Sequence, residues 1–179
     1  MQVAVRPVEA RDHEAIFAIE RRPEVREQQY DFGLKTLTQW QARYFGYYGP
    51  TAIRRHRAVT VDEATVGIIY CWSVRISFSS KRRGVYGWNL HPDFWGRGIM
   101  RQALTLELDS LFDEPHNVSA VADCFHDNAR CLRLLDRLSF MPQWIGPLDR
   151  LHLLSLSRRH VKRFRMTRQH WRQHRGIAR

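Results

Sequence analysis

The sequence predicts a single α/β (α+β) domain in which a mixed sheet carries helices on both faces. Segments with strand-like alternation and segments with helical spacing of apolar residues succeed one another along the chain. The chain has 179 residues, and 44% of them are hydrophobic, which is enough for one well-packed core. We therefore expect one domain and no second core.

The amino-terminal half is predicted to form three strands and two helices. In the second helix, Leu37, Trp40, Tyr44 and Tyr47 recur at helical intervals, so we expect them to share a core-facing side. The last of the strands is rich in β-branched and aromatic residues. In chain order these elements are predicted at 3–8, 12–21, 36–48, 57–61 and 66–75.

The second half is predicted to alternate between strands and helices before it ends in two strands. Pro92 stops the first strand of this half, and Leu104, Leu108 and Leu111 have helical spacing in the segment that follows. The predicted elements are a strand at 85–91, a helix at 98–112, a strand at 117–125, a helix at 129–138, and strands at 140–145 and 151–156.

Positive charge is concentrated at the carboxyl terminus. The chain carries a net charge of +11, yet residues 157–179 hold nine basic side chains and no acidic ones. We therefore divide the chain into a domain over 1–156 and a strongly basic extension over 157–179. The extension is open to three interpretations: a partly disordered segment that aids solubility, an RNA contact with Trp171 and arginines stacking on bases, or an anionic membrane surface contact.

Neither a membrane anchor nor a disulfide framework is expected. The apolar runs are shorter than the ~20 residues that a membrane helix needs, and the first residues lack the pattern of a secretory signal, so a cytoplasmic protein is expected. Cys71, Cys124 and Cys131 are odd in number and lack the spacing of a zinc site, so no metal is expected.

The segment from Leu90 to Met100 lies between a predicted strand and a predicted helix. Gly96 and Gly98 allow backbone N–H groups to turn toward one point, and the helix amino terminus adds partial positive charge. Such a loop can hold a phosphate without any catalytic side chain. The alternative is a simple turn with two glycines, because a lone G-x-G is a weak signal.

A second segment, from Asn128 to Phe140, also follows a strand and opens a helix. Taken alone, Asn128 is explained as a helix N-cap and Cys131 as a small core side chain.

Together the two segments resemble the signatures of the GCN5-related N-acetyltransferase (GNAT) superfamily. The run Trp95–Met100 resembles the acetyl-CoA pyrophosphate loop, and Asn128–Phe140 resembles the segment that follows it in the family. The order H-P-x-F-W-G-x-G resembles the subgroup that contains the ribosomal-protein N-terminal acetyltransferases. The resemblance covers nearly all of residues 3–156 and implies a mostly antiparallel sheet with two splayed central strands.

The resemblance also implies which residues bind acetyl-CoA. The backbone N–H of Leu90 would polarise the thioester carbonyl, and Asn128 would bond the pantetheine arm. Arg130 is a further plausible phosphate partner. The complete set implied for the co-substrate is Leu90, Gly96, Arg97, Gly98, Ile99, Met100, Arg101, Asn128, Cys131 and Arg133.

The catalytic side departs from the family pattern. Val85 stands where many relatives carry a glutamate base, and Leu135 where a tyrosine acid is common. Besides Leu90, we expect His91 as a base and Cys131 as a proton donor to the leaving thiolate. Further candidates for the base are His126, Tyr86 and Asp123. The acceptor side is expected at Tyr30, Phe32 and Trp88.

We therefore expect an enzyme that moves an acetyl group from acetyl-CoA to a primary amine by direct attack in a ternary complex. The first acceptor class is a protein N-terminus, possibly on a ribosomal protein, and Lys81, Arg82 and Arg83 disfavour a polyamine. The alternatives are a small-molecule amine acetyltransferase and a non-catalytic module that binds CoA or RNA. Either a monomer or a homodimer is compatible with the sequence.

Overall fold

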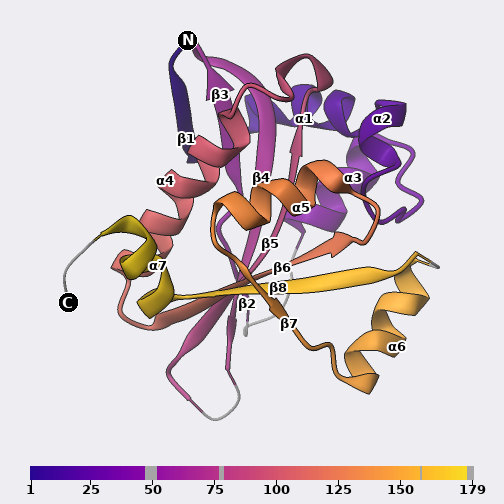
Figure 1. The fold of residues 1–179 in the computed structure, drawn as a ribbon. Helices are drawn as coiled ribbons and strands as arrows, with labels where there is room; N and C mark the ends of the chain where they lie inside the picture. The colour runs from indigo at the N-terminus through magenta and orange to yellow at the C-terminus, as the bar shows by residue number, and fades with distance from the viewer. Residues whose placement is uncertain (47–51, 77–78, 158, 177–179) are drawn as a thin grey trace.

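The computed structural model describes residues 1–46, 52–76, 79–157 and 159–176. The five elements predicted for its amino-terminal half are present to within a few residues at each boundary, whereas α2 and β2 were not predicted. Tyr47 lies outside the described residues. The elements, shown in Figure 1, are β1 (Val3–Pro7), η1 (Ala10–Asp12), α1 (His13–Glu20), α2 (Pro23–Arg26), α3 (Leu37–Phe45), β2 (Ala52–Arg54), β3 (Arg57–Val61) and β4 (Ala64–Arg75).

The second half brings the chain back into the same sheet. Its elements are β5 (Arg82–Leu90), η2 (Pro92–Phe94), α4 (Ile99–Asp113), β6 (Asn117–Phe125), α5 (Ala129–Arg137), β7 (Met141–Gln143), α6 (Pro147–Leu156), β8 (Val161–Thr167) and α7 (Arg168–Arg175). None of the described helices is long and apolar enough to cross a membrane.

Eight strands form one sheet in the order β1-β3-β4-β5-β6-β8-β7, with β2 paired to β4 beside this path. Every pairing is antiparallel except that of β5 with β6, which is parallel. This is the mostly antiparallel mixed sheet that the resemblance implied.

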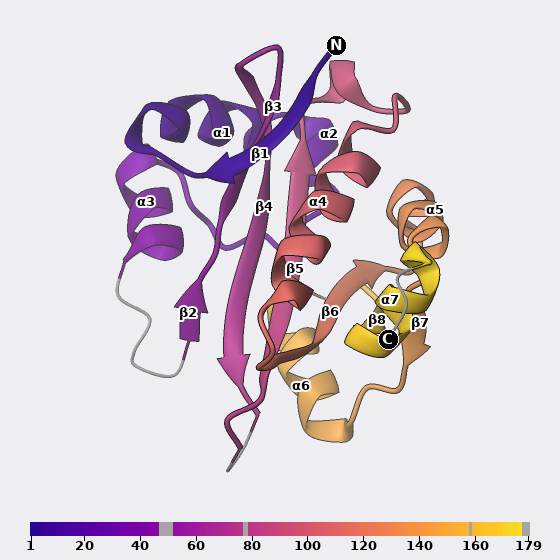
Figure 2. The same ribbon diagram turned by 90° about the vertical axis from the view of Figure 1, so that its left-hand side faces the viewer.

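The two central strands separate along their length. They pair from Arg82 opposite Asn117 to Tyr86 opposite Ala122, but β5 runs on to Leu90 and β6 to Phe125. Figure 2 shows β6 turning away from β5 toward its end. The expected splayed strands are thus present, and backbone groups at their ends are released from the β5–β6 ladder.

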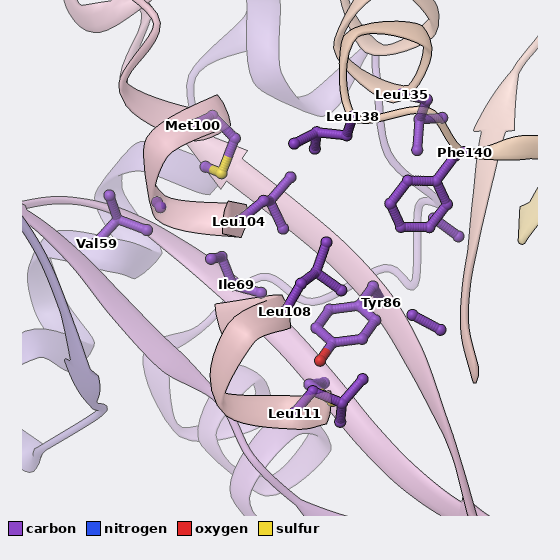
Figure 3. Close-up of a cluster of buried hydrophobic side chains, with 14 of the residues drawn as sticks. Val59, Ile69, Tyr86, Met100, Leu104, Leu108, Leu111, Leu135, Leu138 and Phe140 are labelled. Atoms are coloured by element: carbon purple, nitrogen blue, oxygen red, sulfur yellow. The ribbon is translucent and has the colours of Figure 1, made fainter. Parts of the chain in front are cut away.

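Helices cover both faces of the sheet, as predicted. On one face, α1 and α3 bury Ile16 and Trp40 against Ile68 and Tyr70 of β4. On the other, α4 and α5 pack onto the sheet around Tyr86, as Figure 3 shows for their leucines. Burying a leucine fully is worth about 1.5–3 kcal/mol, so these layers supply most of the drive for folding.

Two sequence predictions about the carboxyl-terminal part are wrong. Residues 151–156 are helical and belong to α6, because Pro147 occupies the first turn of a helix and Asp149 complements its dipole. The described part of the predicted extension belongs to the fold, because β8 lies between β6 and β7 and leads into α7. Trp171 is 1% exposed, so it packs in the core and has no face on which RNA bases could stack.

Candidate active site

A cleft of about 670 Å³ opens where β5 and β6 part. One wall is the loop from Phe94 to Gly98 with the first turn of α4, and another is the inward side of α5. At the far end the cleft meets the segment 28–32, the middle of β4, and the ends of β6 and β8.

The glycine loop leads directly into α4. Gly96 and Gly98 have φ angles of 76° and 75°, a left-handed conformation that favours glycine. The first bond closing the helix runs from Gln102 N–H to the Gly98 carbonyl, 3.0 Å. The N–H groups of residues 99–101 precede that bond, so they have no partner within the helix and are available to an anion.

Hydrogen-bond register fixes where the Leu90 N–H points. His91 N–H donates to the Val66 carbonyl at 2.8 Å, and Leu90 lies opposite Gly67. In an antiparallel ladder this makes Leu90 and Gly67 a non-hydrogen-bonded pair, whose backbone groups point away from each other. The Leu90 N–H therefore points to the β6 side, where β6 has already diverged, and so does that of Trp88 two residues earlier.

Asn128 and Cys131 line the opposite side of the cleft. The Asn128 Oδ1 atom accepts the Cys131 N–H at 3.0 Å, so Asn128 is the N-cap of α5 and its side-chain NH2 group remains for a ligand. The hydrogen bond to Cys124 and burial raise the pKa of the Cys131 thiol. A thiol weaker in acidity than an ordinary one is poorly suited to protonate a leaving thiolate.

Arginines from α4 and α5 surround the loop. Arg130 places its guanidinium 3.9 Å from the ring centroid of Trp95, and the Trp95 ring in turn borders the cleft. Arg97 does not line the described cleft, and its guanidinium lies over Phe94 instead. The arginines that line this end are Arg101, Arg130, Arg133 and Arg137.

Tyr30, Phe32 and Trp88, the three residues predicted for the acceptor side, all line the cleft. Burial, and then the nearby Asp123 carboxylate, raise the pKa of Tyr30, which keeps its hydroxyl protonated. Asp123 also lines the cleft and receives two hydrogen bonds from Arg163, at 2.8 and 2.9 Å.

Most of the candidate proton-transfer residues lie elsewhere. His91 caps η2, its Nδ1 atom accepting the Asp93 N–H at 3.3 Å, and His126 stacks edge-on against His160; neither lines the described cleft. The Tyr86 hydroxyl donates to Glu107 on the α4 side of the sheet. Of the residues considered as proton acceptors, only Asp123 presents its side chain there, because Tyr86 reaches the cleft but directs its hydroxyl away from it.

Sequence reasoning missed Asn89, Arg43 and Arg163, which all line the cleft. Asn89 lies on the same face of β5 as Val85, because side chains alternate along a strand, and this alternation in the sequence could have identified it. Arg163 was hidden in the basic run, because its role depends on β8 joining the sheet.

Known structures share this fold over nearly the whole chain. RimJ of Mycobacterium smegmatis, in complex with CoA-disulfide, is 17% identical with a TM-score of 0.69, over 98% of this chain and 90% of that one. Spermidine N-acetyltransferase of Vibrio cholerae, with CoA and spermine, is 14% identical with a TM-score of 0.73, over 95% and 98%. An aminoglycoside acetyltransferase, AAC(6')-Ib with coenzyme A, is 15% identical with a TM-score of 0.73, over 97% and 99%.

The family assignment rests on the sequence itself. The family model described as an acetyltransferase (GNAT) domain matches residues 2–141, which is most of the chain. That range contains the splayed strands, the glycine loop and α5. The chain therefore belongs to the GNAT acetyltransferase family.

Proposed function

We propose that the protein transfers an acetyl group from acetyl-CoA to a primary amine, and that the amine is a protein N-terminus of the ribosomal-protein type. One observation carries the proposal: the cleft at the β5–β6 divergence has an anion-binding helix terminus at one end and a directed backbone N–H, that of Leu90, beside it. That combination suits a phosphate-bearing thioester.

The residues present fit acetyl-CoA. The N–H groups of Ile99, Met100 and Arg101 would hold the pyrophosphate, because they are unpaired within α4 and sit at the positive end of its dipole. A β-carbon added at Gly96 or Gly98 would meet nothing within 4 Å, so the space in front of the loop is open. The arginines of α4 and α5 would add to the binding of phosphate groups.

Acetyl transfer from a thioester to an amine can proceed without a dedicated acid or base side chain. Acetyl-CoA, when bound, supplies a thioester carbonyl that an amine can attack, with cleavage of the C–S bond. Leu90 N–H would donate to the developing negative charge on that oxygen, the role of an oxyanion hole. Val85 is apolar and Leu135 is fully buried, so neither replaces the missing glutamate and tyrosine.

Positioning would therefore supply most of the acceleration. Holding an amine against a polarised carbonyl makes the reaction effectively intramolecular, whereas a positioned base typically adds only about 10²–10⁴-fold. The Asp123 carboxylate lines the acceptor end, and it is the side chain we assign to receive the amine proton, directly or through water.

Calorimetry with acetyl-CoA is the first test, comparing the wild type with Gly98→Glu. The glutamate side chain would occupy the loop and repel the pyrophosphate, so we expect micromolar binding to be lost. Gly98→Ala is the matched control, because it introduces the same left-handed strain without the charge. Wild-type protein that is folded but does not bind acetyl-CoA would refute the proposal.

Release of the free CoA thiol then tests turnover. We expect release with a peptide N-terminus, and little with spermidine or an aminoglycoside. Release with a small amine alone would instead establish a small-molecule acetyltransferase. Tight binding with no release for any amine would establish a CoA-binding module, which is the outcome that the absence of a glutamate at position 85 makes worth testing.

A further inference from the structure

Positive side chains outnumber negative ones in the lining of the cleft. The lining residues that the structure describes include six arginines but a single carboxylate, that of Asp123. Four of the arginines belong to α4 and α5 at the glycine-loop end. The other two, Arg43 of α3 and Arg163 of β8, belong to the acceptor end.

That single carboxylate is already paired. Both Asp123 oxygens receive hydrogen bonds from the Arg163 guanidinium, which also bonds Asp149 of α6. A polyamine or an aminoglycoside carries several positive charges and would meet two arginines and an aspartate that is already paired with one of them. The charges of this end therefore oppose a cationic acceptor.

Two more arginines extend this charge along the same face of the sheet. Asp123 lies opposite Arg163, Val121 opposite Arg165, and Ser119 opposite Arg83. Because side chains alternate along a strand, residues 119, 121 and 123 and their partners share one face. Val121 and Asp123 line the cleft, so the arginine cluster (Arg83, Arg163 and Arg165) begins at its wall.

The cluster contains polar atoms that lack partners. The Nε atoms of Arg83 and Arg165 and the Oγ atom of Ser119 are buried and, within the described residues, have no hydrogen-bond partner. Ser119 is completely buried. Burial, followed by the charges of Arg165 and Arg163, lowers the pKa of Arg83, while the Asp149 carboxylate acts in the opposite direction. An anion would satisfy donors and relieve repulsion together.

We propose that the arginine cluster binds a carboxylate of the acceptor, so that the protein prefers N-terminal segments with acidic residues just after the reacting amine. This inference rests on the proposed function, since it names the substrate class of the same site. Guanidinium groups recognise carboxylates by paired N–H···O bonds, and a half-buried cluster of them favours an acidic peptide over its amide analogue. The same charges oppose cationic acceptors such as spermidine or an aminoglycoside.

The test uses three peptides that differ only in charge. Their sequences are Ala-Glu-Glu-Gly-Ser-Tyr, Ala-Gln-Gln-Gly-Ser-Tyr and Ala-Lys-Lys-Gly-Ser-Tyr, each with a free N-terminus. With saturating acetyl-CoA, we expect kcat/KM for the acidic peptide to exceed that for the glutamine peptide by at least about tenfold, because charged hydrogen bonds are worth more than neutral ones. The lysine peptide should be the poorest acceptor.

Substitutions of the cluster arginines test whether the cluster causes the preference for the acidic peptide. Arg165→Gln and Arg83→Gln should reduce the acidic-over-glutamine ratio to near one, mainly through KM. Lys162→Gln removes one positive charge from the same strand at an exposed position on the other face, so it should keep the ratio. Arg163 is unsuitable as the test position, because its bonds to Asp123 and Asp149 make a structural effect certain.

Binding measurements separate this inference from the proposed function. If no peptide is acetylated, calorimetry of the acidic and glutamine peptides on CoA-loaded protein still decides whether the cluster binds carboxylate. Equal kcat/KM for the two peptides, or a preference that survives in both variants, would overturn the inference while leaving acetyl transfer intact. Preference for the lysine peptide would overturn it as well.

Discussion

The Trp95 indole N–H donates to the Leu90 carbonyl oxygen at 2.8 Å, and thereby ties the glycine loop to the end of β5. The same peptide unit is held at its other side, where His91 N–H donates to Val66 at 2.8 Å. The peptide group between Leu90 and His91 is thus held by one hydrogen bond at its carbonyl and another at its N–H. Trp95 therefore anchors the glycine loop to the end of β5.

Trp95→Phe tests this tie. The variant keeps an aromatic ring under Arg130 but loses the bond to Leu90, and one such bond contributes about 1 kcal/mol. We expect acetyl-CoA to bind about three- to tenfold more weakly by calorimetry. Trp144→Phe, at a side chain that is exposed and outside the cleft, is the control. Unchanged affinity in Trp95→Phe would show that the loop needs no such anchor.

Two glycines of β5 should respond in opposite ways to enlargement. A β-carbon at Gly87 would meet nothing within 4 Å and would point into the cleft, whereas one at Gly84 would lie 2.6 Å from the Tyr86 ring. We expect Gly87→Val to unfold like the wild type in urea but to lose acetyl transfer. Gly84→Val should lose stability by about 1–3 kcal/mol through overpacking. Full activity in folded Gly87→Val would show that this part of the cleft is not used.

The site was predictable where short-range geometry determines it. Gly96, Gly98 and Asn128 have roles that follow from a strand-to-helix turn and an N-cap, and the structure places them at the cleft. His91 does not line the described cleft, because its ring caps η2 by accepting the Asp93 N–H, a role that the sequence pattern alone did not reveal.

The carboxyl-terminal part shows the limit of spacing arguments. Phe164 and Trp171 are seven residues apart, a helical interval, yet Phe164 lies in β8 and Trp171 in α7. Both side chains pack in the same core, one from a strand and the other from a helix. This arrangement depends on the pairing of β8 with β6, which lies forty residues earlier in the chain. Similarly, the apolar run of α6 is compatible with a strand or a helix. Pro147 distinguishes the two, because proline is favoured in the first turn of a helix.

His56 should make stability depend on pH. Burial lowers the pKa of His56 from an ordinary value of 6.5 to about 4. Its Nδ1 atom accepts the Cys71 N–H at 3.1 Å, so protonation in the folded state would break that bond. Between pH 6.5 and 4 the unfolded chain binds a proton that the folded chain does not, so stability falls as the pH is lowered through this window.

The loss reaches at most about 3 kcal/mol, because one pKa unit corresponds to ~1.4 kcal/mol. Urea unfolding at several pH values between 4 and 7 would measure the slope for the wild type and for His56→Gln. The glutamine cannot take up the proton, so its slope should be shallower in this window even though its stability at pH 7 is lower. Equal slopes would assign the pH dependence to other groups.

Deletion of the residues after Ser157 tests whether the basic segment is part of the fold. It would remove β8 from between β6 and β7 and take Met166 and Trp171, which are 0% and 1% exposed, out of the core. Losing even one large core side chain costs about 3–5 kcal/mol, and a typical domain has only about 5–15 kcal/mol in total. We therefore expect the truncated chain to show no cooperative unfolding transition by circular dichroism.

The control for this deletion must change charge and leave the fold intact. Arg172→Gln removes a positive charge from an exposed position of α7 and should alter stability by no more than about 0.5 kcal/mol. A truncated chain that unfolds cooperatively with the same urea midpoint as the wild type would show that β8 does not contribute to the stability of the sheet. Loss of folding would mean that anion binding by this segment has to be studied through single substitutions, since Arg163 and Arg165 are both part of β8.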